Sequence, residues 1–79
     1  MTTHSPEFNF LKEGLATDLV CLLSESFGMS LEQALDALYS SRTYEVICDP
    51  RTRFYLQSPL YVFSFLKEEI ETGRFMPEN

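Results

Sequence analysis

Apolar residues recur every three to five positions in three separate stretches of the chain, and this spacing constrains the fold more than any other feature. Spacings of three and four place side chains along one face of an α-helix, whereas a strand would alternate apolar and polar residues. The three stretches therefore predict three helices. In the first stretch the apolar residues are Phe8, Leu11, Leu15, Leu19, Leu22 and Phe27, with Val20 and Leu23 widening the stripe.

The first predicted helix covers about residues 8–27. Ser5 and Pro6 can start it, because a proline in the first helical position loses no bonded N–H. Gly28 can end it in the left-handed conformation that terminal glycines adopt. Gly14 lies inside this helix and is less favourable there than alanine by about 1 kcal/mol, which also allows a later start.

The second predicted helix has the clearest start signal. Ser30 can cap its first turn, and Gln33 three residues later can complete a capping box. Met29 and Ala34 occupy the two positions of a hydrophobic staple around this cap. We expect its buried face to contain Leu31, Ala34, Leu35 and Leu38.

The last predicted helix begins after Ser58 as the cap, with Pro59 in the first position. It runs to about Thr72, and Gly73 terminates it. Its apolar stripe contains Val62, Phe63, Leu66 and Ile70, and its solvent-facing side carries Lys67, Glu68, Glu69 and Glu71. We expect three leucines to meet at the helix junction, namely Leu19, Leu35 and Leu66.

The middle of the chain allows two interpretations. Thr43 can cap a short helix over Tyr44–Cys48, which Asp49-Pro50 would end because the residue before a proline avoids helical geometry. An extended arm near residues 50–57 would follow. The alternative is a β-hairpin with Tyr44–Cys48 and Arg53–Gln57 as its arms, which their β-branched and aromatic residues favour. A lone hairpin is marginally stable in water, so we prefer the helix and arm.

These elements predict an all-α fold: a small bundle of three main helices plus a short helix, with an extended arm near residues 50–57. The chain of 79 residues has room for one core, so residues 1–79 form a single helical domain. Seven Phe and four Tyr supply apolar area that offsets the chain entropy lost on folding. The ends near 1–6 and 75–79 are expected to be frayed.

The charge of the chain narrows the classes of partner. Twelve acidic residues against six Lys and Arg give a net charge of −6. An acidic chain without a basic stripe is repelled by phosphate backbones, and it lacks the Lys/Arg clusters that anionic membranes recruit. We therefore do not expect nucleic acid or a membrane surface as the partner, whereas a basic protein partner is compatible with this charge.

Few residues in the chain carry the chemistry of catalysis or metal binding. Cys21 and Cys48 are the only cysteines, and His4 is the only histidine. They do not form a metal-ligand set, and a nucleophile would lack a base. We therefore expect no cofactor and no enzymatic activity. The chain does not open with a signal peptide and has no bilayer-spanning stretch, so we expect free thiols in the cytoplasm.

The second half of the chain carries a recognisable pattern of caps and aromatic residues: Ser41-Arg42-Thr43-Tyr44-Glu45, Asp49-Pro50, Tyr55-Leu56-Gln57-Ser58-Pro59, Tyr61 and Phe65-Leu66-Lys67-Glu68-Glu69. Over about residues 16–72 this pattern resembles short bacterial helical proteins that form a domain family of unknown function. Members are often encoded beside genes for toxin-like or accessory proteins. The resemblance implies a partner-binding or regulatory accessory protein, and it implies no active-site residues.

Arg51, Arg53 and Tyr55 are the candidate partner-binding residues. They bring basic and aromatic groups together on a segment with weak local structural signals, and Tyr and Arg are enriched at binding hot spots. The structural alternative is that Phe54 and Leu56 fill the helix cluster while Tyr55 lies half exposed. The sequence leaves both interpretations open.

The expected function is a non-enzymatic protein-interaction or regulatory accessory module that binds another protein or itself. The alternative is a nucleic-acid-associated regulator, such as one half of a toxin–antitoxin-like pair. A helix–turn–helix over residues 30–48 would favour this alternative. Its second helix, however, would begin with Tyr44-Glu45-Val46, where base contacts require Arg, Lys, Asn or Gln.

Overall fold

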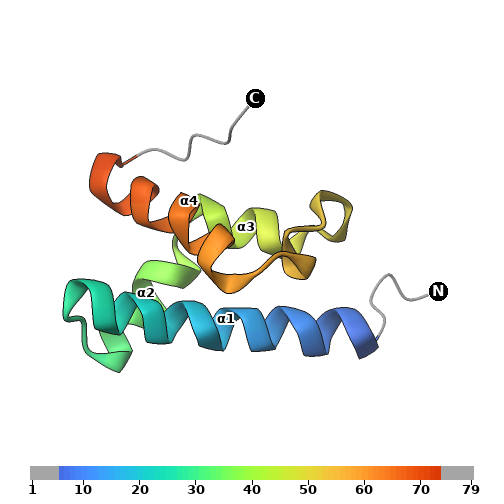
Figure 1. Ribbon diagram of the computed structural model, residues 1–79, viewed down its shortest axis with the longest axis horizontal. Helices are drawn as coiled ribbons and strands as arrows, with labels where there is room; N and C mark the ends of the chain where they lie inside the picture. The colour runs from blue at the N-terminus through green and yellow to red at the C-terminus, as the bar shows by residue number, and fades with distance from the viewer. Residues whose placement is uncertain (1–5, 74–79) are drawn as a thin grey trace.

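The computed structural model describes residues 6–73, and all its regular structure is helical (Figure 1). No strand occurs within these residues, so the all-α prediction is confirmed and the hairpin alternative is wrong. Pro6 already belongs to the first helix, whereas Ser5, His4 and residues 74–79 lie outside the described part. In chain order the elements are α1 (Pro6–Phe27), α2 (Leu31–Tyr39), α3 (Arg42–Cys48), the short 3₁₀ helices η1 (Pro50–Thr52) and η2 (Phe54–Leu56), and α4 (Pro59–Thr72).

A three-residue turn joins α1 to α2, and Figure 1 shows α2 folded back against the C-terminal half of α1. Gly28 adopts a φ of +69°, and its N–H donates to the Ser24 carbonyl at 3.0 Å. At the start of α2 the Gln33 N–H donates to Ser30 Oγ, while the Ser30 N–H donates to Gln33 Oε1. The terminal glycine and the capping box are confirmed.

Figure 1 shows α3 and α4 side by side over the α1–α2 pair. The cap of α4 is as predicted, because the Tyr61 N–H donates to Ser58 Oγ at 3.3 Å and Pro59 holds the first position. Gly73 ends the helix with a φ of +79°. The start and end of this helix therefore follow from its own sequence.

The core lies where α1, α2, α3 and α4 meet. Leu19 and Leu66 are fully buried there, as predicted, but Leu35 is only partly buried. The buried cluster consists of Leu15, Leu19, Val20, Leu23, Ala34, Leu38, Ile47, Val62, Phe63 and Leu66.

Two leucines predicted to be buried lie at the surface. Leu31 is 66% exposed, because Met29 packs against the core at this end of α2 and leaves Leu31 on the outside. Leu11 is 38% exposed and lies at the edge of the buried face of α1. Helical periodicity identifies the apolar face but does not show where the neighbouring elements stop covering it.

The predicted cap of the short helix is also wrong. Ser41, not Thr43, caps α3, since the Tyr44 N–H donates to Ser41 Oγ at 3.0 Å. Thr43 lies inside the first turn, fully buried. Its N–H and hydroxyl donate to the carboxylate of Glu69 in α4, so Glu69 does not belong to the solvent-facing side to which the sequence assigned it.

Candidate functional site

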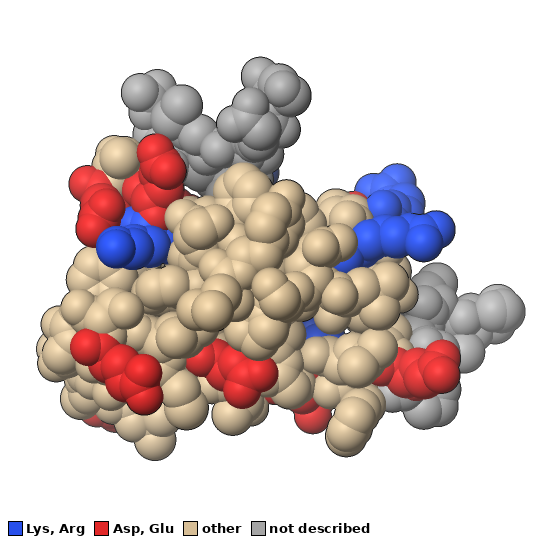
Figure 2. All heavy atoms as spheres, in the orientation of Figure 1, with Lys and Arg blue, Asp and Glu red and all other residues tan. Residues whose placement is uncertain are grey.

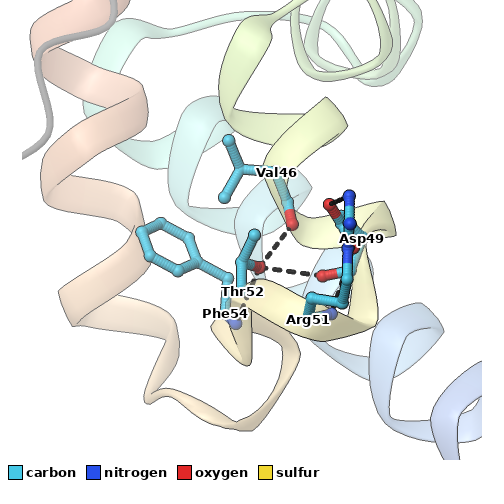
Figure 3. Close-up of polar contacts among 5 residues, drawn as sticks. All are labelled: Val46, Asp49, Arg51, Thr52 and Phe54. Atoms are coloured by element: carbon cyan, nitrogen blue, oxygen red, sulfur yellow. Dashed lines mark hydrogen bonds and ion pairs between the residues drawn. The ribbon is translucent and has the colours of Figure 1, made fainter.

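The segment expected to be an extended arm instead folds into η1 and η2, and side-chain hydrogen bonds hold its first turn (Figure 3). Asp49 Oδ1 accepts from the Arg51 N–H at 3.1 Å and so caps η1, while Pro50 supplies a helical φ. The Thr52 hydroxyl lies 2.7 Å from the Val46 carbonyl and 2.9 Å from the Asp49 carbonyl. The Phe54 N–H donates to the same hydroxyl. These local bonds satisfy backbone groups that an extended arm would leave to water.

Arg51 reaches back to Asp49 within the same turn. Its Nε and Nη2 donate to the two carboxylate oxygens at 3.1 and 2.9 Å, although the Arg51 side chain is 88% exposed. This bidentate pair lowers the pKa of Asp49 and raises that of Arg51. Much of the positive charge at Arg51 is thus already opposed by a carboxylate of the protein.

Arg53 is the residue at which the chain turns between η1 and η2. It has φ 61° and ψ 15°, and within residues 6–73 it is the only non-glycine residue with a positive φ. Its side chain is exposed. A left-handed conformation is unfavourable for residues with a Cβ, so the flanking turns impose it.

Tyr55 does not share an outward surface with Arg51 and Arg53. It is half-buried, and its ring meets the ring of buried Phe8 in α1 edge to face, with centroids 4.8 Å apart. The neighbouring Phe54 packs against α4, where the centroid of its ring lies 5.4 Å from that of Phe65. Tyr55 therefore attaches η2 to α1 and is a packing residue.

The structural alternative for this segment is only partly correct. Phe54 packs against the core, as this alternative predicted, and Tyr55 packs there too. Leu56, which was also predicted to fill the helix cluster, is 53% exposed. Two residues that the sequence did not single out lie nearby, namely Leu60 and Tyr61, exposed by 69% and 49%. Both lie outside the apolar stripe of α4, and an apolar residue outside that stripe is the sequence signal that could have identified them as exposed.

We name Arg53, Leu56, Leu60 and Tyr61 the η2–α4 surface. Tyr61 also contacts Phe54 and Phe65, at centroid distances of 6.3 and 5.2 Å, so its ring is anchored while one side stays open. Figure 2 shows a face without charged side chains over the first part of α4, with Lys and Arg beside the η1–η2 end and charged residues again at the C-terminal end of α4. The surface is thus apolar with a basic edge.

A separate groove lies between α1, α2 and α3, where it encloses about 320 Å³. A second, shallower hollow of about 470 Å³ lies on the surface of α2, whose residues alone line it, and it shares Leu35 and Tyr39 with the first. We name both together the interhelix groove. Its lining residues are Lys12, Glu13, Ala16, Thr17, Val20, Glu32, Gln33, Leu35, Asp36, Tyr39 and Tyr44.

Two tyrosines form one wall of the interhelix groove. The rings of Tyr39 and Tyr44 meet edge to face, with their centroids 5.0 Å apart. Burial raises the pKa of Tyr44 to about 12, and the neighbouring Cys48 thiol and the charge of Glu13 add to this rise. Tyr39 by contrast is 56% exposed and presents its ring to solvent at the edge of the groove.

Residues 6–73 contain no group of three His, Cys, Asp or Glu side chains arranged to hold a metal ion. Cys21 is exposed, Cys48 is half-buried, and both thiols are free. Within the same residues, none of the helices has the length and apolar character needed to cross a membrane. Comparison with protein-family models, curated proteins and solved structures finds no match to this chain, so the family resemblance stays a prediction.

Proposed function

We propose that this chain is a non-enzymatic protein-interaction module, and that the η2–α4 surface is one place where a partner binds. The observation that carries the proposal is the exposure of Leu56, Leu60 and Tyr61 within six consecutive residues. A single exposed leucine is ordinary, but neighbouring exposed apolar residues with a polar rim are typical of binding surfaces.

The composition of this surface supports the proposal. Tyr61 is held from one side by Phe54 and Phe65, so little side-chain entropy is lost when a partner covers its open side. Arg53 adds a cation at the edge, and Tyr and Arg are enriched among hot-spot residues. Of the three partner-binding candidates named from the sequence, Arg53 is the one that this proposal retains as a direct contact. Arg51 adds a rim contact, and Tyr55 supports η2 from beneath.

We further propose that the partner is another protein or a second copy of this chain, in a regulatory accessory role. The two free thiols are in keeping with a reducing compartment such as the cytoplasm. A nucleic-acid partner receives no support from this surface, because Asp49 opposes Arg51 and the net charge of the chain is −6.

The test is a double variant, Leu60→Ser with Tyr61→Ala, compared with Leu31→Ser. Leu31 is 66% exposed and provides a matched control on α2. Sedimentation velocity measures self-association, and capture on the immobilised protein from the cells of origin measures binding of other proteins. We expect the double variant to lose the complex while it keeps its helicity and stays folded at the temperature of the assay.

The control variant should retain the complex. If the double variant folds normally and keeps every complex that the wild type forms, the η2–α4 surface is not a binding site. If neither the wild type nor the control forms any complex, the proposal of an interaction module is wrong.

A further inference from the structure

The interhelix groove exists because α1 is much longer than the helix that packs beside it. α1 has 22 residues and α2 has 9. At 1.5 Å per residue their lengths are about 33 and 14 Å. After the tight turn α2 therefore covers only the C-terminal half of α1, and the chain then leaves toward α3 (Figure 1). Among residues 6–73, the face of α1 around Ala16 is bordered by Leu35, Tyr39 and Tyr44 but is not covered by a further helix.

The floor and the wall of the groove have the chemistry of a helix-packing site. Ala16 is small and partly buried, and Val20 and Leu35 extend the apolar floor toward α2. Tyr39 and Tyr44 close one side with rings at a fixed edge-to-face angle. A short residue between larger ones lets a second helix approach closely, as ridges enter grooves.

The rim of the groove is acidic. Glu13 and Lys12 line the part between α1, α2 and α3, and Glu32 and Asp36 line the adjoining hollow on α2, so three carboxylates stand against one cation over the two together. The two ion pairs formed among residues 6–73 are Arg42–Glu45 and Arg51–Asp49, so neither neutralises a carboxylate of the groove. The ammonium of Lys12 lies 5.4 Å from the centre of the Phe8 ring, which draws it toward the start of α1.

We propose that the interhelix groove binds a basic amphipathic helix of a partner protein. The apolar face of that helix would lie on Ala16 and Leu35 and against Tyr39, and its Lys or Arg side chains would reach the carboxylates at the rim. The groove then follows the helix-in-groove mode of recognition, in which apolar anchors recur at helical spacing. The inference rests on the proposed function, but it concerns a different surface from the η2–α4 surface.

The probe is an 18-residue labelled peptide with a leucine face flanked by lysines, and its counterpart has glutamates in place of the lysines. Fluorescence anisotropy with the full chain measures affinity. We expect the lysine peptide to bind in the micromolar range and the glutamate peptide to bind at least about tenfold more weakly. Amide shifts in NMR spectra should concentrate in residues 12–20 and 32–44.

A matched pair of charge variants separates the groove from the overall charge. Glu32→Gln with Asp36→Asn removes two carboxylates from the groove, and Glu68→Gln with Glu71→Gln removes two exposed carboxylates from α4. The groove pair should weaken lysine-peptide binding about tenfold, and the α4 pair less than about threefold. Equal weakening by both pairs would show attraction to net charge alone and would overturn the inference.

A matched pair of tyrosine variants separates the two surfaces. Tyr39→Ala should weaken peptide binding, whereas Tyr61→Ala should leave it unchanged. The reverse result would place the peptide on the η2–α4 surface, so the groove inference would fail while the proposed function stood. The inference would also fail if the lysine peptide did not bind at about 1 mM. A self-associating chain that lost its association only in the groove variants would identify a second copy as the occupant, and this too would overturn it.

Discussion

The carboxylate of Glu69 in α4 accepts two hydrogen bonds from Thr43 in α3, from the backbone N–H at 3.0 Å and from the hydroxyl at 2.8 Å. It also accepts from the Arg42 N–H at 2.7 Å. The first turn of α3 is thus capped twice, by Ser41 from the same segment and by Glu69 from a helix 26 residues away. An anion at a helix N-terminus is favoured, so the contact connects α3 to α4.

Replacement of Glu69 should therefore destabilise the fold more than replacement of a neighbouring glutamate. We expect Glu69→Ala to lower the free energy of unfolding by about 1–3 kcal/mol, because it leaves buried Thr43 without its partner. Glu68→Ala, at an exposed position of the same helix, should change it by less than about 0.5 kcal/mol. Urea unfolding followed by circular dichroism measures both, and equal effects would show that the capping contact contributes nothing.

Tyr55 should behave as a packing residue. Tyr55→Ala removes the edge-to-face contact with Phe8 and opens space between η2 and α1, so we expect a loss of about 2–4 kcal/mol. Tyr61→Ala keeps Phe54 and Phe65 in contact and should lower stability less. Thermal unfolding of the two variants provides the comparison. A Tyr55→Ala variant that melted like wild type would return Tyr55 to the list of surface residues.

Arg53 carries backbone strain that glycine would relieve. Its φ of 61° is a conformation that a Cβ disfavours, so Arg53→Gly should stabilise the fold by up to about 1 kcal/mol. Arg53→Val should destabilise it, because β-branched residues fit this region poorly. If the side chain binds a partner, Arg53→Gly should also weaken that complex. Melting temperatures and partner capture on the same two variants separate the backbone effect from the side-chain effect.

The glycine inside α1 and the glycine that follows its last residue should respond in opposite directions to the same substitution. A Cβ added at Gly14 would meet no atom within 4 Å, so Gly14→Ala should stabilise the helix by about 1 kcal/mol. Gly28 also has open space, but its positive φ makes Gly28→Ala destabilising by a similar amount. Chemical denaturation tests both changes. A destabilised Gly14→Ala variant would indicate a function for this glycine that the described contacts do not explain.

Tyr44 should make the fold sensitive to alkaline pH. The pKa of Tyr44 is about 12 in the folded protein, against 10.0 for a tyrosine side chain without these interactions. The neutral ring therefore contributes stability that is fully present below pH 10 and is lost as the pH rises toward 12. Because the chain has no Trp, absorbance at the phenolate band reports tyrosine alone. Tyr44→Phe should remove the highest-pH phase of that titration, and Tyr39→Phe should retain it.

Local signals in the sequence determined the helices and most of their ends. The Ser30–Gln33 capping box, the Ser58-Pro59 start and the glycines at positions 28 and 73 act within a few residues, so they could be read without knowledge of the fold. Burial of Leu19 and Leu66 followed from their central positions in apolar stripes.

The roles of several other residues depend on how the helices pack against one another. Glu69, which the sequence assigned to a solvent-facing side, caps α3, Tyr55 packs on Phe8, and Leu31 and Leu56 lie at the surface. The interhelix groove likewise depends on where α2 stops beside α1. Each of these outcomes is a contact, or the absence of one, between segments far apart in the chain. Local propensity cannot determine such contacts, because they depend on which surfaces the packed helices bring within reach.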